Sequence, residues 1–216
     1  NRNMKTRKIR TALYNVLPGE KAHALMAPRP KYIEGIEGVH PCPPVNSAIL
    51  ALIVPFENEL ALPLIKRVNR GKYHGGQIAF PGGKMEKEDA DALQTALREC
   101  HEEIGVPEEK VSILGVLSDI YIPLSNFNIT PIVGTTLQLP DFILSQDEVE
   151  KVILVKLRDL FDDRNKTTHS FVRHDHKIIA PGYKIGENFI WGATAMIIAE
   201  LEQLMKTNTF NHLGKL

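Results

Sequence analysis

The sequence predicts a mixed α/β fold in which a mixed β-sheet packs between helices. Strand-like apolar segments alternate with helical segments along the chain and outnumber them. The 216 residues, 43% of them hydrophobic, suffice for one domain with a sizeable core. We therefore expect a helical N-terminal extension with an irregular connection over residues 1–44, followed by the main α/β domain over residues 45–216.

The N-terminal extension is expected to contain two helices. Residues 6–16 and 19–26 have helical patterns, and Pro28 and Pro30 end the second helix. Residues 27–44 are rich in proline and glycine, which indicates an irregular connection to the main domain.

The main domain contains a series of expected strands. Residues 47–56 form a continuous apolar run typical of a buried strand, and residues 59–67 pair with it across a turn at Glu57 and Asn58. Further expected elements are strands at 77–80, 111–122, 130–139 and 152–157, a helical turn at 158–161, a hairpin of 169–173 and 177–179, and a C-terminal helix at 193–206.

One expected helix, residues 90–104, has an apolar stripe along one face. Asp89 is expected to cap its start, and Gly105 followed by Pro107 ends it. At about 100° per residue, the stripe consists of Leu93, Ala96, Leu97, Cys100 and Ile104. This stripe is expected to face the core.

Three carboxylates converge beside that stripe. Glu99 and Glu103 are one turn apart, and Glu102 lies roughly 60° further round the helix. Like charges at this spacing repel each other, and acids near a helix C-terminus oppose the helix dipole. Grouped carboxylate oxygens suit Mg²⁺ or Mn²⁺, whose coordination is completed by water and substrate phosphate oxygens. The helix therefore predicts metal-assisted phosphoryl chemistry.

The acidic helix resembles the signature of the Nudix hydrolases, G-x5-E-x7-R-E-U-x-E-E-x-G-U, where U is a bulky aliphatic residue. Residues 98–106, Arg-Glu-Cys-His-Glu-Glu-Ile-Gly-Val, match its second half, with Cys100 as one soft substitution. The loop from Gly83 is one residue longer than the general pattern. The same insertion, with acids at positions like Glu86 and Asp89, is found in the coenzyme A pyrophosphatase-type branch of the family.

A second segment is similar to the extended signature of that branch, L-L-T-x-R-S-x-x-L-R-x-H-x-G-Q-V-x-F-P-G-G. The identical positions are Arg67, His74, Gly76, Gln77, Phe80, Pro81, Gly82 and Gly83. The departures are Pro63, Ile65, Val68, Gly71, Lys72 and Ile78, several of which fall in the half associated with coenzyme A specificity. With later blocks at residues 147–149 and 190–195, the resemblance covers residues 45–204.

The resemblance implies an α/β/α sandwich and a set of metal-site roles. The carbonyl of Gly83 would join Glu99 and Glu103 around the metal, while the fork of Arg98 would orient a ligand carboxylate. Glu102 is either a third ligand, directly or through water, or the base for the attacking water.

Residues outside the helix complete the candidate site. Arg67 is a candidate phosphate contact, since a guanidinium matches phosphate oxygens bidentately. His74 and Gln77 are either substrate contacts or structural residues, and Gly82 allows close approach of the backbone to a ligand. Glu148 lies in an acidic loop that could simply be solvated, but the resemblance implies a base or an extra metal contact.

Two other features are expected to be structural. The spacing of His169, His174 and His176 does not predict zinc, because no cysteine accompanies them and the segment reads as an exposed hairpin. Trp191 is expected to be a core anchor.

The implied activity is hydrolysis of a diphosphate bond in a nucleoside diphosphate derivative, with coenzyme A or its acyl or oxidised forms as the first candidate. Coenzyme A would give adenosine 3′,5′-bisphosphate and phosphopantetheine. The altered residues Ile65, Val68 and Gly71 motivate ADP-ribose or another sugar nucleotide as the alternative. A non-catalytic nucleotide-sensing domain is the third hypothesis, against which the retained acidic motif argues.

Composition bounds the partners and the compartment. The chain has 26 basic and 26 acidic residues, so its charge favours neither a nucleic acid nor a membrane partner. No apolar run reaches membrane-spanning length, and two cysteines do not make a disulfide framework. We expect a cytoplasmic enzyme with a small nucleotide substrate, in which the basic N-terminal helix could mediate a homodimer.

Overall fold

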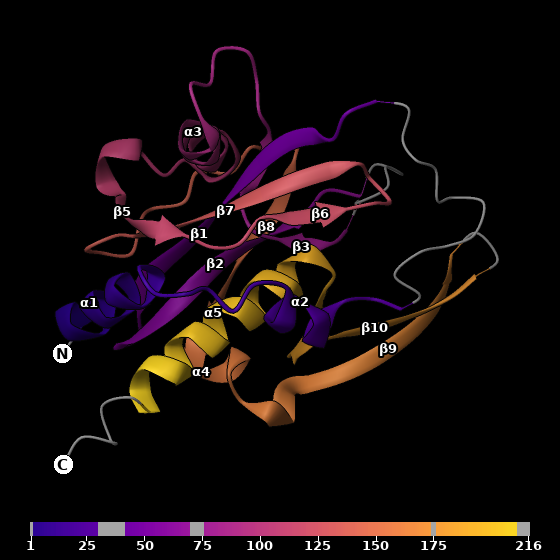
Figure 1. Cartoon of the computed structure of the whole chain (residues 1–216). Coiled ribbons are helices and arrows are strands. Elements are labelled where there is room, and N and C mark those ends of the chain that lie inside the picture. The colour runs from indigo at the N-terminus through magenta and orange to yellow at the C-terminus, as the bar shows by residue number, and fades with distance from the viewer. Residues whose placement is uncertain (1, 30–41, 70–75, 174–175, 211–216) are drawn as a thin grey trace.

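The fold is a three-layer α/β/α arrangement, seen in a computed structural model that describes residues 2–29, 42–69, 76–173 and 176–210. Helix α3 (Ala92–Ile104) covers one face of the main sheet. Helices α1 (Arg2–Leu13), α2 (Glu20–Met26) and α5 (Ala193–Phe210) cover the other face (Figure 1). The expected mixed α/β sandwich is therefore confirmed.

The main sheet has eight strands and is built around β1 (Val45–Phe56). The first part of β1 pairs in parallel with β7, from Val45↔Phe127 to Ile53↔Thr135, whereas its last residues pair antiparallel with β2, from Val54↔Ala61 to Phe56↔Glu59. Strands β3 and β8 extend the sheet from β2, and β5 and β6 extend it from β7. The remaining bounds are β2 Glu59–Arg67, β3 Ile78–Ala79, β4 Gly82–Lys84, β5 Ser112–Val116, β6 Ile120–Ile122, β7 Phe127–Thr135 and β8 Val149–Lys156.

Both faces of β1 are buried, which explains its uninterrupted apolar sequence. Leu50 and Leu52 point into the core beneath α3, whereas Ala51 and Ile53 point into the core beneath α5. This alternation follows the period of two of a β-strand. The apolar stripe of α3 packs onto the first of these cores, so its polar flank is fixed above the sheet.

A smaller sheet follows the main one. It consists of β9 (Lys166–Arg173), β10 (His176–Ile185) and β11 (Asn188–Trp191) in the order β11-β10-β9. Along the chain, the short helix α4 (Leu157–Leu160) and a 3₁₀ turn at Asp163–Asn165 connect the last strand of the main sheet to the smaller sheet. Another 3₁₀ turn, Glu108–Lys110, follows α3.

Several expected boundaries were wrong. The run 111–122 is divided into β5 and β6, and the strand expected to reach residue 139 ends at Thr135. The expected hairpin is longer than its apolar pattern indicated, and β11 was not expected. The first helix spans Arg2–Leu13 rather than residues 6–16. None of the helices in the described part of the chain is long and apolar enough to cross a bilayer.

Candidate functional site

The site begins at a glycine turn that β1 holds in place. Strand β4 pairs with β1 through Ile49↔Gly82 and Ala48↔Gly83. A Cβ atom on Gly82 would lie 2.6 Å from the Cα of Ile49, so only glycine fits between the two strands. The Gly82 amide donates a hydrogen bond of 2.9 Å to Oε2 of Glu103. The turn is thereby joined to the last part of α3.

The carboxylate of Glu99 lies directly against the backbone of Gly83. A Cβ atom on Gly83 would lie 2.5 Å from the Cδ of Glu99, so a side chain there would displace the carboxylate. Burial raises the pKa of Glu99, an effect that Arg98 opposes and that Glu102 and Glu148 reinforce. Glu99 and the glycine turn therefore form a cradle for which a larger residue leaves no space.

Glu103 is a buried carboxylate that is incompletely satisfied. The residue has no exposed surface, and its Oε1 accepts no hydrogen bond. The guanidinium of Arg67 forms an ion pair with it, with Nη2 at 3.4 Å from Oε1. Burial raises the pKa of Glu103 to about 7, although Arg67 and the Gly82 amide lower it; the charges of Glu99 and Glu148 add to the rise. The site thus concentrates more negative charge than its own residues neutralise.

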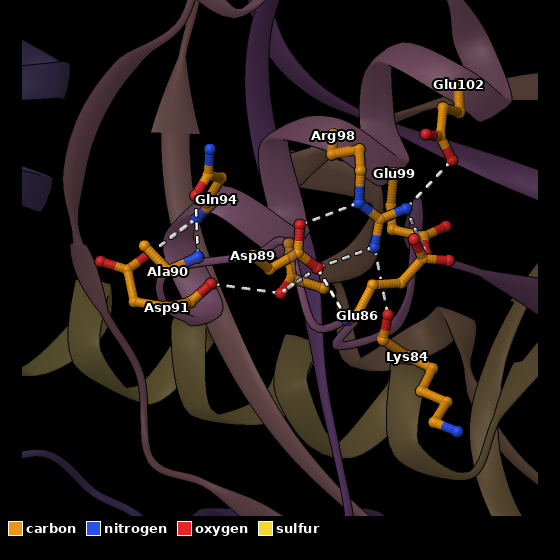
Figure 2. Close-up of polar contacts among 10 residues, drawn as sticks. Lys84, Glu86, Asp89, Ala90, Asp91, Gln94, Arg98, Glu99 and Glu102 are labelled. Carbon is orange, nitrogen blue, oxygen red and sulfur yellow. Dashed lines mark hydrogen bonds and ion pairs between the residues drawn. The ribbon is translucent and has the colours of Figure 1, made fainter.

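The guanidinium of Arg98 donates hydrogen bonds to acceptors on two sides of the site (Figure 2). Its Nε and Nη2 donate to the two carboxylate oxygens of Asp89 at 3.0 and 2.9 Å. Its Nη1 donates to Glu99 and to Glu102, both at 3.0 Å, and its Nη2 also donates to the carbonyl oxygen of Lys84 at 3.1 Å. Arg98 therefore orients the acidic residues, as expected from the motif.

The expected helix cap was wrong. Asp91, not Asp89, is the N-cap: its Oδ1 accepts from the Gln94 amide at 2.9 Å, and α3 begins at Ala92. Asp89 is buried instead, where Arg98 holds its pKa well below the ordinary range, with help from the Glu86 amide. An Asp with a Gln three residues later is a capping signal that could have identified Asp91.

The two glutamates of uncertain role differ in their surroundings. Glu148 is exposed and directly precedes β8, and its charge adds to the rise in the pKa of both Glu99 and Glu103. The side chain of Glu102 is 54% exposed and accepts a hydrogen bond from Arg98. Both residues are therefore solvent-accessible, and Glu148 stays a candidate through its electrostatic effect on the buried pair.

Of the remaining residues that the sequence singled out, Gln77 lies beside the site, whereas His169 and Trp191 lie in the smaller sheet. The Arg67 amide donates to the Gln77 carbonyl oxygen at 3.0 Å, so Gln77 adjoins the site. His74 lies outside the described residues. His169 stacks on Phe189 with ring centroids 3.8 Å apart, and Trp191 contacts Phe171 edge-on at 4.9 Å.

The acidic residues of the site supply the oxygen ligands that a divalent cation prefers, but their side chains do not surround a single point. Within residues 2–29, 42–69, 76–173 and 176–210, no three acidic, histidine or cysteine side chains form a ready metal shell. Arginines hold the carboxylates instead. However, the unsatisfied Oε1 of Glu103 and the cradle between Glu99 and Gly83 present hard oxygen donors in a site with excess negative charge.

Comparisons with known proteins agree with this geometry. A family model described as the NUDIX domain matches residues 46–174. A protein of Enterobacter sp. strain 638, named uncharacterized Nudix hydrolase NudL, is 34% identical over 161 residues, which is 73% of this chain and 82% of that protein. A protein of the same name from Pectobacterium atrosepticum is 35% identical over 158 residues, which is 72% of this chain and 80% of that protein.

Solved structures give a weaker likeness. The crystal structure of a NUDIX hydrolase from Nitrosomonas europaea has a TM-score of 0.49 and 20% identity, and the match covers 81% of this chain and 76% of that one. Such a likeness is too low to bear on function.

Proposed function

The chain belongs to the Nudix hydrolase family, and from this premise we propose that it cleaves the diphosphate bond of coenzyme A or of its acyl or oxidised forms. As a Nudix pyrophosphohydrolase, the protein is an enzyme that acts on nucleoside diphosphate derivatives. The more specific substrate is our proposal. The products from coenzyme A would be adenosine 3′,5′-bisphosphate and phosphopantetheine.

The observation that supports the proposal is that the two segments similar to family signatures meet at one point. Gly82 and Glu103 are joined by a hydrogen bond, and Arg67, which comes from the upstream signature, lies 3.4 Å from the same carboxylate. The segment similar to the coenzyme A pyrophosphatase-type signature therefore ends at the acidic centre. A guanidinium at this place suits a diphosphate, because its fork matches phosphate oxygens.

One departure from that signature also has a structural reading. Ile65 is fully buried in the core beneath α3, so its side chain is not available to a substrate. This removes one of the three residues that motivate the ADP-ribose alternative. Val68, by contrast, is partly exposed and follows Arg67 directly, so the alternative is retained.

We propose that Glu99, Glu103 and the Gly83 carbonyl hold Mg²⁺ or Mn²⁺, with Glu102 as a further ligand directly or through water. When bound, such an ion withdraws charge from the phosphates and lowers the pKa of a water. Arg98 keeps Glu99 and Glu102 oriented, and Arg67 binds a phosphate oxygen. Loss of any of these contacts would misplace the scissile diphosphate.

For the base that takes the proton of the attacking water, we propose Glu148. Its charge acts on both Glu99 and Glu103, whereas the carboxylate of Glu102 is already paired with Arg98. A base needs a carboxylate that is available to the attacking water, which supports Glu148 over Glu102. Water would add to one phosphorus while the bridging oxygen leaves with the other phosphate.

The test is a substrate panel with the purified full chain. Coenzyme A, ADP-ribose, NADH and dinucleoside polyphosphates are incubated with Mg²⁺ or Mn²⁺, and products are separated and identified by mass. We expect coenzyme A to give the highest kcat/KM and EDTA to abolish cleavage. A wide preference for ADP-ribose would replace the proposed substrate, and no cleavage of any member would refute the enzymatic role.

Variants separate the proposed site residues from their surroundings. Glu99→Gln and Glu148→Gln should each lower kcat by about a hundredfold or more, the usual scale for a lost acid–base or ligand group. Glu150→Gln is the matched control, since Glu150 is close in sequence but exposed and paired with Lys66 at 2.7 Å. Full activity of Glu99→Gln would show that the ligand assignment is wrong.

A non-catalytic sensing domain would bind nucleotides in the same panel without product. The cytoplasmic location, the absence of nucleic-acid and membrane partners, and a homodimer formed through the N-terminal helix remain predictions. Light scattering of the full chain tests the dimer.

A further inference from the structure

Arg67 has a loose contact with the most buried acid of the site. Its Nη2 lies 3.4 Å from Glu103 Oε1, an oxygen that accepts no hydrogen bond. The Arg67 side chain is 34% exposed, whereas that of Glu103 is 1% exposed. The carboxylate therefore has a neighbouring positive charge but no directional bond from it.

The backbone around Arg67 is fixed, so the loose contact does not come from a loose strand. The Arg67 amide donates to the Gln77 carbonyl oxygen at 3.0 Å, and its own carbonyl accepts from the Gly76 amide at 2.9 Å. On the other side, Val68 donates to the Glu148 carbonyl oxygen at 2.9 Å. The pairing of β2 with β8 shifts register between Lys66 and Arg67, which is the point where the strand reaches the site.

The second arginine of the site behaves differently. Arg98 donates hydrogen bonds to three carboxylates and one carbonyl oxygen, at 2.9 to 3.1 Å. Removing Arg98 from this network would break several bonds, whereas moving Arg67 away from Glu103 breaks none. Of these two arginines, Arg67 is the one that can leave its carboxylate without breaking a hydrogen bond.

We propose that Arg67 is a placeholder cation, which balances Glu103 in the metal-free protein and releases this carboxylate when a divalent ion binds. An unpaired buried carboxylate is costly, so a counter-charge stabilises the empty site. A divalent ion on Oε1 would repel the guanidinium 3.4 Å away, and no hydrogen bond holds the guanidinium to this oxygen, so we expect the ion to displace it. The freed guanidinium is then available to a substrate phosphate, a last step that rests on the proposed function.

This proposal predicts that Arg67 competes with the metal. Replacing Arg67 by glutamine should therefore tighten Mn²⁺ binding in the absence of substrate, by about three- to fivefold if the contact has the strength of a partly exposed ion pair. A residue that only supports the metal site would have the opposite effect, because its loss would weaken binding.

Lys66→Gln is the matched control. Lys66 is the preceding residue, its side chain is 31% exposed, and it pairs with the exposed Glu150 at 2.7 Å. Both substitutions remove one positive charge at similar exposure. A general gain in negative potential would tighten Mn²⁺ binding equally in both variants, whereas displacement from Glu103 would act only in Arg67→Gln.

The experiment uses the full chain, stripped with EDTA and dialysed, and titrates Mn²⁺ by electron paramagnetic resonance of the free ion. We expect a lower Kd for Arg67→Gln and a Kd within about twofold of wild type for Lys66→Gln, since Lys66 is paired with Glu150 and not with an acid of the site, and a partly exposed charge is screened. Arg67→Lys provides a second variant of retained charge, with a Kd closer to wild type. In a Glu103→Gln background, Arg67→Gln should no longer tighten binding.

The outcomes separate this inference from the proposed function. If wild type binds Mn²⁺ and cleaves a substrate but Arg67→Gln binds no tighter than Lys66→Gln, the placeholder role is overturned and the proposed function stands. If the single variant Arg67→Gln does not fold, the double variant is compared with Glu103→Gln alone. Tighter Mn²⁺ binding by the double variant then overturns the placeholder role, because Arg67 would be acting without its carboxylate. If wild type binds no Mn²⁺, both the placeholder role and the proposed metal site are refuted.

Discussion

Replacing Asp89 by asparagine should destabilise the fold because it removes the buried partner of Arg98. The Asp89 carboxylate is 2% exposed and accepts two hydrogen bonds from Arg98, one from the Glu86 amide and one from the Thr95 hydroxyl. Asparagine offers one oxygen in place of two, so its amide group must face one of these donors.

The magnitude follows from the burial of the two partners. Breaking a fully buried ion pair costs about 3–5 kcal/mol. Arg98 is 22% exposed and keeps other acceptors, so water and the remaining carboxylates partly compensate. We expect a loss of about 2–4 kcal/mol in the free energy of unfolding.

Urea unfolding in EDTA at neutral pH measures this loss. Asp91→Asn is the control, because Asp91 is an exposed N-cap and asparagine caps a helix about as well as aspartate. That variant should therefore remain within about 0.5 kcal/mol of wild type. Equal stability of the Asp89→Asn and Asp91→Asn variants would refute the anchoring role of Asp89.

The pH dependence gives a second check. In the folded protein, Arg98 lowers the pKa of Asp89 below its ordinary value of 3.8. Stabilisation by Asp89 is therefore complete above about pH 4 and is lost as the pH falls below that value. The difference between wild type and Asp89→Asn should shrink in this acid range.

Three further predictions follow from other parts of the molecule. In EDTA, the free energy of unfolding of Glu103→Gln should exceed that of wild type by up to about 3 kcal/mol at pH 8 and equal it near pH 4. The reason is that burial raises the pKa of Glu103 from 4.5 to about 7, so wild type loses stability as the pH rises through this window. Urea unfolding at several pH values checks this slope, and a difference that does not change with pH contradicts it. Gly83→Ala should fold normally but lower kcat by about tenfold or more, because the added Cβ displaces only the side-chain carboxylate of Glu99. Gly82→Ala should instead lower Tm, because its Cβ would collide with the backbone of β1. Calorimetry and the coenzyme A assay distinguish the two variants, and equal Tm values would contradict the contrast. Glu200→Gln should lower the free energy of unfolding by about 2 kcal/mol or more, because Glu200 is fully buried and accepts hydrogen bonds from His23 and Ser118 at 2.8 and 2.6 Å. Thermal unfolding measures this loss, and a Tm within about a degree of wild type would contradict it.

The elements with local signals could be predicted from the sequence. The strand pair of β1 and β2 and the apolar stripe of α3 follow from short-range periodicity, and the turn at Glu57 and Asn58 has the positive φ angles expected of a tight hairpin. The convergence of Glu99 and Glu103 also follows from helical spacing alone.

The elements decided by distant contacts could not be predicted. The run 111–122 is broken where the Ser118 amide and hydroxyl turn to Glu200, which lies 82 residues further along the chain. Strand β7 ends at Thr135, whose partner in β1 is Ile53. Neither partner is visible from local sequence.

The same reason explains the errors within the site. Helical spacing gave no information on the hydrogen bonds of Arg98, whose Nη1 donates to both Glu99 and Glu102. It also gave no reason to bury Asp89, since its partner Arg98 lies nine residues further along the chain. Because Glu99 and Glu102 both accept from Arg98, their different exposure follows from their positions round the helix.

Strand β1 pairs with β7 along its first part and with β2 at its end, so the site lies between two parts of the main sheet. The glycine turn is attached to the part that contains β1 and β7, whereas Arg67 and Glu148 are attached to the part that contains β2 and β8. The relative placement of these two parts of the sheet therefore sets the span between the acidic centre and the groups opposite it. Substitutions in the sheet interior could widen or narrow that span, so relatives with identical site residues could accommodate molecules of different length.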